Sequence, residues 1–346
     1  MTKKQNMFGN AIDLLSEKLG GRAVVCSDDF FAEVGNLVKE EAAIFIPDKY
    51  TERGKWMDGW ESRRKREEGH DWAILRLGVA GEIDVIDIDT SHFLGNHAPI
   101  ASIEYASDED CSDADVDQLD FRPLLEQVPL QKGSSNYFCV KNSPSKITHL
   151  KLHIYPDGGV ARLRVYGKPN PSWKVNEDDL RYQLEEGEVD LAAMRNGGQT
   201  LLCSDMFFGV MSNLIAPQRA RVMGEGWETR RSRRVGFDWI IVKLGTVGSI
   251  SSIVLDTNHF KGNFAHSAEV EGILSPDISL MELQECEWTS ILTNQFLKEH
   301  FEHQYRNEIV NSGPFSHVRL RIYPDGGVSR MRIYGQVSTI NNVKEL

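Results

Sequence analysis

The strongest constraint on how this 346-residue chain can fold is that its sequence repeats itself. Three segments of the first half recur in the second half at a nearly constant offset. The pairs are Gly-Trp-Glu-Ser-Arg-Arg at 59–64 with Gly-Trp-Glu-Thr-Arg-Arg at 226–231, Asp-Thr-Ser-His-Phe-Leu-Gly-Asn at 89–96 with Asp-Thr-Asn-His-Phe-Lys-Gly-Asn at 256–263, and Tyr-Pro-Asp-Gly-Gly-Val at 155–160 with the same six residues at 323–328. This steady offset predicts two copies of one fold.

A weaker match upstream and a change in composition set the expected domain limits. Gly20-Gly21 matches Gly197-Gly198 at a larger offset, so the first copy carries about ten extra residues between 39 and 58. Prolines and acidic residues replace any periodic pattern between the copies. We therefore expect a first repeat at 1–168 with a core at about 20–167, a connector at 169–196, and a second repeat at 197–346 with a core at about 197–335.

Charge and composition narrow the functional class. Hydrophobic residues make up 40% of the chain, which is enough for a sizeable core. The net charge of −12 argues against a nucleic-acid partner, because phosphate binding needs a basic surface. The acidic residues concentrate at 104–120 and 177–190, which we interpret as solvated loops, and the rest of the chain is close to neutral. A small anionic substrate is therefore compatible with the fold.

Nothing in the sequence predicts export or a membrane span. No run reaches about 18 apolar residues, and no apolar segment follows the N-terminal lysines as it would in a signal peptide. The five cysteines include no Cys-x-x-Cys pair, and Cys26 and Cys203 lie in apolar strand contexts typical of unreactive thiols. We therefore expect a cytoplasmic protein with no membrane partner. The sequence leaves its oligomeric state open, a homo-oligomer included.

Alternating runs near the end of each copy predict strands. Residues 149–155 and 161–166 alternate polar and apolar side chains, which is the pattern of half-buried strands. We interpret the two runs as an antiparallel hairpin joined by a type I turn at 155–158 with a left-handed glycine, and the second copy repeats it. The arginines on the polar face are expected on a solvated face or a face between the repeats, with a substrate clamp as the alternative: Arg162, Arg164, Arg330 and Arg332.

Other β-rich runs lie at 22–26, 43–46, 72–77, 83–88 and 250–255. Residues 281–310 favour helix by propensity, but they align with 114–142, where prolines and glycines break any helix, so we give precedence to the repeat. No long amphipathic helix separates the strands. The expected fold is all-β, with two tandem jelly-roll β-sandwich domains of galactose-binding-domain-like type that arose by internal duplication.

The three repeated motifs resemble those of the allantoicase (allantoate amidinohydrolase) family, and the resemblance covers nearly the whole chain, from Gly20 to Gly335. It implies hydrolysis of allantoate to ureidoglycolate and urea, a step of purine and allantoin degradation used for nitrogen supply, on two jelly-roll repeats. It assigns no catalytic residue. The roles of individual residues are therefore argued from chemistry.

Release of urea from allantoate needs a proton for the departing nitrogen, a water directed at the central carbon, and a clamp for the carboxylate. The first motif offers Glu61 as a catalytic carboxyl and Arg63 as a clamp, and both side chains share one face if the segment is extended. Their second-copy counterparts, Glu228 and Arg230, are candidate substrate-binding residues. The alternative interpretation is a surface ion pair beside a core tryptophan.

The second motif offers Asp89 and His92 as a catalytic acid or base with its orienting partner. The alternative is a turn with a structural histidine. The remaining candidate substrate-binding residues are Asn96 and His97 in the same loop, Asp28 at a strand end, and Asp256 and His259 in the second copy.

Asp87, Asp89, His92 and His97 offer mixed oxygen and nitrogen donors but match no metal-site pattern, and the second copy has Val254 and Phe264 in place of two of them. We therefore predict no metal site. The sequence leaves the cofactor unknown, a divalent metal included.

Two alternative functions stay open: hydrolysis of a related ureido acid such as ureidoglycolate, and non-catalytic ligand binding by a tandem β-sandwich protein. The charged loops favour an enzyme. The first copy carries ionisable residues where the second has apolar ones, so we predict that the first copy dominates catalysis, although two independent sites or one shared site remain open. The differing pairs are Asp29 and Met206, His70 and Phe237, Asp87 and Val254, and His97 and Phe264.

Overall fold

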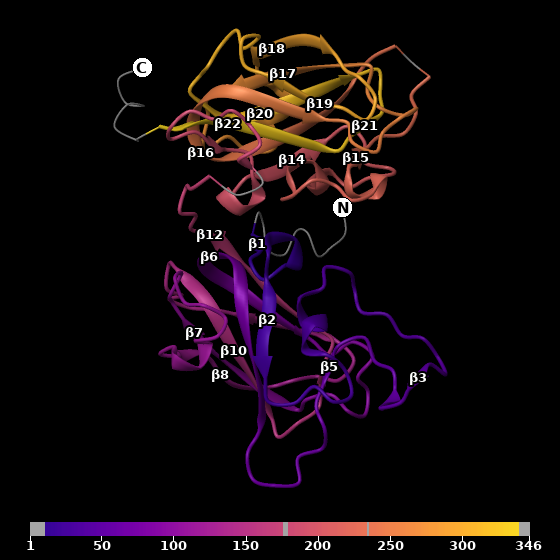
Figure 1. The fold of residues 1–346 in the computed structure, drawn as a ribbon, viewed down its shortest axis with the longest axis vertical. Coiled ribbons are helices and arrows are strands. Elements are labelled where there is room, and N and C mark those ends of the chain that lie inside the picture. The colour runs from indigo at the N-terminus through magenta and orange to yellow at the C-terminus, as the bar shows by residue number, and fades with distance from the viewer. Residues whose placement is uncertain (1–10, 176–178, 234, 339–346) are drawn as a thin grey trace. The chain divides into compact units, whose positions relative to one another are not determined.

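The computed structural model describes residues 11–175, 179–233 and 235–338. The chain forms two compact units, Met1–Pro171 and Ser172–Leu346 (Figure 1). Strands and short 3-10 turns make up both units, and the described residues contain a single α-helix, the four-residue α1 (Glu282–Glu285). No helix among the described residues is long and apolar enough to cross a membrane.

One long strand, β6 (Asp71–Asp89), organises the first unit, because its two halves pair with different strands. Its first half pairs with β2 (Arg22–Cys26) and β10 (Ile147–Tyr155), and β7 (Ile100–Ala106) and β8 (Arg122–Pro129) extend that layer. Its second half pairs with β9 (Ser135–Cys139) and β12 (Arg162–Pro169), and β1 (Ile12–Asp13) lies at the edge. All of these pairings are antiparallel.

The second unit repeats this arrangement strand by strand around β16 (Asp238–Asp256). Its first half pairs with β14 (Gln199–Cys203) and β20 (Phe315–Tyr323), followed by β17 (Ser267–Ile273) and β18 (Thr289–Phe296). Its second half pairs with β19 (Glu302–Tyr305) and β22 (Arg330–Val337), with β13 (Val189–Asp190) at the edge. The prediction of two tandem all-β sandwiches from one duplication is confirmed.

Each sandwich has one short two-residue pairing near the loops of the candidate site. β5 (Trp60–Glu61) pairs with β11 (Gly159–Val160), and β15 (Trp227–Glu228) pairs with β21 (Gly327–Val328). The extra residues of the first copy include a hairpin of β3 (Tyr50–Thr51) and β4 (Gly54–Lys55).

The core of the first unit lies between the two layers. Leu150 and Leu152 of β10 are fully buried and pack in one cluster with Leu75 of β6 and Leu163 of β12. The equivalent residues Leu320 and Met331 are fully buried in the second unit. The predicted apolar faces of these strands are confirmed.

The predicted hairpin is wrong, because β10 and β12 each pair with β6 and not with one another. Between these two strands, β11 pairs with β5, and Trp60 of β5 is buried. The peptide bonds before Pro156 and Pro324 are cis, which the sequence did not predict. The left-handed glycines are confirmed, with φ of 131° at Gly158 and 129° at Gly326.

The other strand predictions have mixed outcomes. Residues 22–26 are β2, and the runs at 72–77 and 83–88 are parts of the single strand β6. Residues 43–46 form no strand. Residues 281–310 contain β18 and β19 besides the short α1, so the repeat was a better guide there than helix propensity.

The prediction of an exposed arginine face is wrong, because Arg162, Arg330 and Arg332 are 2%, 4% and 5% exposed. The Arg162 guanidinium lies 2.9 Å from the Asp58 carboxylate and also donates to the backbone carbonyls of Asp58 and Glu41. The loop at 41–58 therefore covers the polar face of β12. Strand alternation alone cannot reveal such a cover.

The limits of the repeats and of the acidic segments also differ from expectation. Leu191 and Ala192, placed in the connector, are fully buried in the second unit beside β13, and β1 starts the first unit before residue 20. Two-residue strands carry no periodic signal. Within the acidic segment 104–120, Asp113 forms ion pairs with Arg22 and Arg76 at 2.6 and 3.6 Å, so part of that segment is anchored to the sheet.

Candidate active site

An open cleft of about 1010 Å³ lies where β5 and β11 meet the neighbouring loops of the first unit. Four segments and Asp71 of β6 line it, and the segments are 27–31 after β2, 61–67 from the end of β5, 95–99 before β7, and 156–158 between β10 and β11. Five of the residues predicted from the sequence meet there: Asp28, Glu61, Arg63, Asn96 and His97.

The loop after β2 is held by Trp60 and Asp28. The buried Trp60 indole Nε1 donates to the Asp28 carbonyl at 2.8 Å. The Asp28 carboxylate accepts hydrogen bonds from the backbone N–H of Arg63 at 2.9 Å and from Arg63 Nε at 2.6 Å. Partial burial acts to raise the pKa of Asp28, but the hydrogen bonds from Arg63 and Phe30 outweigh it, so the pKa is lowered. Asp28 therefore stays ionised and fixes the start of the 61–67 segment.

Glu61 is the partly buried carboxyl of the cleft. Its Oε1 accepts a hydrogen bond from Asn96 Nδ2 at 2.7 Å, and Oε2 has no hydrogen-bond partner among the described residues. Burial raises the pKa of Glu61 above its usual value, although the Asn96 hydrogen bond opposes this. A carboxyl with a raised pKa and a free oxygen is suited to proton transfer.

Four consecutive basic residues, Arg63, Arg64, Lys65 and Arg66, line the same cleft. Lys65 is fixed at both ends, because its backbone N–H donates to Asp157 Oδ2 at 2.7 Å and its Nζ lies 2.8 Å from Asp71 Oδ1. Together they form a cationic wall that can bind a carboxylate.

Sequence reasoning missed Lys65, Asp71 and Asp157 as parts of the site. Asp71 is 1% exposed, and its Oδ1 also accepts a hydrogen bond from Ser27 Oγ at 2.9 Å. Its Oδ2 and the Nδ1 of His97 are buried and have no hydrogen-bond partner among the described residues. Lys65 could have been found from the sequence, because Ser232 stands at the equivalent position of the second copy.

Asp89 and His92 do not line this cleft among the described residues. Asp89 Oδ1 accepts a hydrogen bond from the Ser91 backbone at 2.8 Å. His92 has a positive φ of 70°, and its Nε2 lies 3.0 Å from the Ala43 carbonyl oxygen. Both residues shape the loop that leads to Asn96.

The second unit preserves the frame around Glu228. Asn263 Nδ2 donates to Glu228 Oε1 at 2.6 Å, and the Arg230 backbone donates to Asp205 at 2.6 Å. The Arg230 guanidinium lies over the Phe207 ring, 4.5 Å from its centroid. However, Ser232 replaces Lys65 and Phe264 replaces His97, so this frame has fewer ionisable groups.

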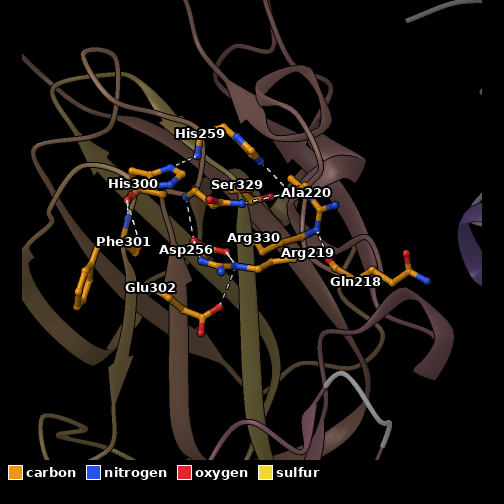
Figure 2. Close-up of polar contacts among 12 residues, drawn as sticks. Gln218, Arg219, Ala220, Asp256, His259, His300, Phe301, Glu302, Ser329 and Arg330 are labelled. Atoms are coloured by element: carbon orange, nitrogen blue, oxygen red, sulfur yellow. Dashed lines mark hydrogen bonds and ion pairs between the residues drawn. The ribbon is translucent and has the colours of Figure 1, made fainter.

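Asp256 and His259 take part in a network that ties neighbouring loops together (Figure 2). The carboxylate of Asp256, which is 1% exposed, lies 3.0 Å from Arg219 Nε and accepts from the Asn258 backbone at 2.8 Å. His259 Nε2 lies 3.0 Å from the Ala220 carbonyl oxygen, as His92 does from Ala43. These contacts are those of loop anchors.

The cysteines behave as predicted. All five are free, and burial raises the pKa of both Cys26 and Cys203 to about 11, which disfavours the reactive thiolate. Among the described residues, no group of three or more His, Cys, Asp or Glu side chains is arranged to hold a metal ion.

Sequence comparison identifies what each repeat is similar to. The family model of the allantoicase repeat matches residues 12–170 and 189–338. The probable allantoicase of Stutzerimonas stutzeri is 45% identical over 335 residues, which cover 95% of this chain and 97% of that protein. The probable allantoicase of Photobacterium profundum is 44% identical over 332 residues, which cover 95% and 97%.

Solved structures give the same result. An allantoicase structure matches with a TM-score of 0.76 at 37% identity, covering 94% of this chain and 93% of that chain. The allantoicase of Saccharomyces cerevisiae matches with a TM-score of 0.76 at 36% identity, covering 97% of this chain and 98% of that chain.

Proposed function

The chain belongs to the allantoicase family and hydrolyses allantoate to ureidoglycolate and urea, and we propose that the reaction takes place in the cleft of the first repeat. The single observation that carries this placement is the Glu61–Asn96 pair, in which a carboxyl of raised pKa faces a cleft walled by four basic residues. The family relationship favours this activity over the alternatives of another ureido acid hydrolase or a non-catalytic binding protein.

Glu61 supplies a proton to the departing nitrogen. Water attacks the central carbon of allantoate, a C–O bond forms, and the C–N bond to one ureido group breaks. The departing nitrogen must gain a proton for urea to leave as a neutral molecule. Burial favours the protonated form of Glu61, which is the form an acid needs, and the Asn96 amide fixes the orientation of its carboxyl group.

The cationic wall binds the substrate carboxylate. Arg64 and Arg66 line the cleft and attract an anion by charge and hydrogen bonding, whereas Lys65 is paired with Asp71. Arg63 is held by Asp28 and places the following residues, so Asp28 acts on the substrate through Arg63. Asp89 and His92 act indirectly, because they position the loop that carries Asn96.

The second repeat keeps a structural role in this proposal. Glu228 and Arg230 keep the hydrogen bonds to Asn263 and Asp205, and Asp256 and His259 anchor loops. Ser232 and Phe264 replace the cleft residues Lys65 and His97. We place the enzyme in the cytoplasm without a nucleic-acid partner, because its free thiols and its net charge of −12 favour a reducing compartment and disfavour phosphate binding.

An assay of both products tests the activity and the acid together. Purified protein incubated with allantoate should release urea and ureidoglycolate in equal amounts. Glu61→Gln keeps the shape of the side chain but cannot donate an acidic proton, so kcat should fall about a hundredfold or more at unchanged folded concentration. Full activity in this variant would remove Glu61 from the mechanism.

A further inference from the structure

A chain of three titratable side chains lies at the border of the cleft in the first repeat. His70 Nε2 is 2.9 Å from His153 Nδ1, and His153 Nε2 is 3.0 Å from Glu104 Oε2. His70 immediately precedes β6, while His153 and Glu104 belong to the neighbouring strands β10 and β7 (Figure 1). The three side chains therefore connect three adjacent strands.

The histidine end of this chain adjoins the cleft. His70 directly precedes Asp71, which lines the cleft and binds Lys65. The His70 ring packs against Tyr155, with ring centroids 4.4 Å apart, and Tyr155 directly precedes the cleft residue Pro156. Glu61 and His70 thus stand near the two ends of the segment that walls the cleft.

One assignment of protons to the ring nitrogens satisfies both hydrogen bonds. An ionised Glu104 can only accept, so His153 Nε2 donates to it. The other nitrogen of a neutral His153, Nδ1, is then an acceptor, and His70 Nε2 must donate to it. This leaves a lone pair on His70 Nδ1, the atom through which a neutral imidazole acts as a base.

The surroundings of His70 favour its neutral form. Burial lowers its pKa first, followed by His153 and by the positive charges of Lys65 and Lys151, while Asp71 acts in the opposite direction and is outweighed. The environment therefore raises the pKa of the cleft carboxyl Glu61 and lowers that of His70, which directly precedes the cleft residue Asp71. Such opposed shifts are typical of an acid and a base that work together.

The second repeat has replaced this chain by a fixed ion pair. Phe237 occupies the position of His70, and Arg321 occupies that of His153. The Arg321 guanidinium lies 3.8 Å from the centroid of the Phe237 ring and 2.5 Å from Glu269. Because arginine stays protonated near neutral pH, the second repeat keeps the packing but loses the acid–base chemistry.

Building on the proposed function, we propose that His70 is the general base of the reaction and that His153 and Glu104 position it. His70 Nδ1 takes one proton from the attacking water as the C–O bond forms. Glu61 gives one proton to the departing nitrogen as the C–N bond breaks. The proton on His70 is then released to solvent and Glu61 regains one from solvent, so both groups return to their starting states.

The pH dependence of kcat/KM tests this inference. For the unmodified enzyme, the plot of kcat/KM against pH should be bell-shaped, with one limb for each proton-transfer group. His70→Phe copies the residue that the second repeat accommodates at this position, so the variant should fold. The His70→Phe substitution should lower kcat about a hundredfold or more and remove one of the two limbs of the pH profile. In a separate His70→Gly variant, added imidazole should restore part of the activity.

Variants of the positioning residues provide a matched control. Glu104→Gln should shift the limb of the pH profile that His70 produces, and it should lower kcat less than His70→Phe does. Glu271→Gln, at the equivalent position of the second repeat, should leave both limbs in place. Two unchanged limbs in His70→Phe would overturn the inference. If Glu61→Gln still abolishes activity in that case, the proposed cleft stands and only the base is wrong. If neither Glu61→Gln nor His70→Phe affects turnover, the cleft itself is wrong.

Discussion

Arginine has two different roles in the first repeat. Arg162 is buried and donates to the Asp58 carboxylate and to three backbone carbonyl groups. Arg64 is exposed at the cleft and has no hydrogen bond or ion pair with the described residues. A cation without a structural partner at a cleft is available to a ligand, whereas the buried cation stabilises the fold.

Arg64 therefore provides a prediction about binding. Arg64→Ala should raise KM for allantoate about tenfold, equivalent to about 1.4 kcal/mol, and change kcat less, because a carboxylate clamp holds substrate and transition state alike. The melting temperature should stay the same. Steady-state kinetics should show no comparable effect for Arg231→Ala, the exposed equivalent in the second repeat. An equal KM change in both variants would contradict the assignment.

For individual residues, the sequence predicted which types of side chain form the site but not which of them line the cleft. Glu61, Arg63 and Asn96 were found because their motifs repeat as blocks. Lys65, Asp71 and His70 were not assigned roles, since their contacts join residues from separate segments, as the 2.9 Å contact between His70 and His153 shows. Asp89 and His92 contact the backbone of Ser91 and Ala43, and a motif cannot distinguish that role from catalysis.

Among the structural elements, the turn between β10 and β11 links stability to the site. Gly158 has a φ of 131°, and an added Cβ would lie 2.7 Å from the Ala98 backbone nitrogen and 2.8 Å from the His97 carbonyl carbon. Gly326 has a φ of 129° and a similar clash with Ala265. Only Gly158 lies in the catalytic cleft of the proposal.

Gly158→Ala and Gly326→Ala should each reduce the free energy of unfolding of their own repeat by about 1 kcal/mol or more, because a Cβ is forced into the left-handed region. Gly158→Ala should also lower turnover per folded molecule, since it displaces the loop that carries Asn96 and His97. Gly326→Ala should not. Thermal unfolding and kinetics at matched folded concentration test both effects, and equal turnover in the two variants would show that the turn is purely structural.

The edge strand β13 provides a prediction about pH. Asp190 is 2% exposed, and burial raises its pKa to about 6 despite the nearby Arg332 and the backbone hydrogen bonds. The folded protein therefore binds a proton more tightly than the unfolded chain between about pH 4 and pH 6, so the contribution of Asp190 to stability falls as the pH rises through this range.

Asp190→Asn removes this dependence. The stability of the variant relative to the unmodified protein should rise by up to about 3 kcal/mol from pH 4 to pH 7, at about 1.4 kcal/mol per pKa unit. Denaturant unfolding at several pH values measures it. Asp13→Asn should behave in the same way in the first repeat, where burial also raises the pKa to about 6. A constant difference at all pH values would contradict the assigned shift.

The strands themselves were largely predictable, but their pairing was not. Alternation located the buried faces of β10 and β12, yet it could not show that both strands pair with β6, because pairing depends on distant partners. Short elements such as β1 and β13 were missed, since two residues carry no period.

For the whole chain, duplication explains the shared architecture, and later substitutions explain the differences between the two units. The two units have the same strand order, and their glutamate–asparagine pairs have nearly equal distances of 2.7 and 2.6 Å. The first repeat alone combines that pair with Lys65, His97 and the His70–His153–Glu104 chain. Sequence comparison of the copies predicted this asymmetry, and the structure gives it a physical basis in hydrogen-bonded contacts.

A direct comparison of Glu61→Gln with Glu228→Gln tests the central claim that the first repeat carries out catalysis. Both substitutions keep a partner for the local asparagine, so both variants should fold. At matched folded concentration, Glu61→Gln should lower kcat for allantoate about a hundredfold or more, and Glu228→Gln should change it by less than about threefold. Equal halving of kcat by either substitution, or its near-abolition by both, would contradict the claim.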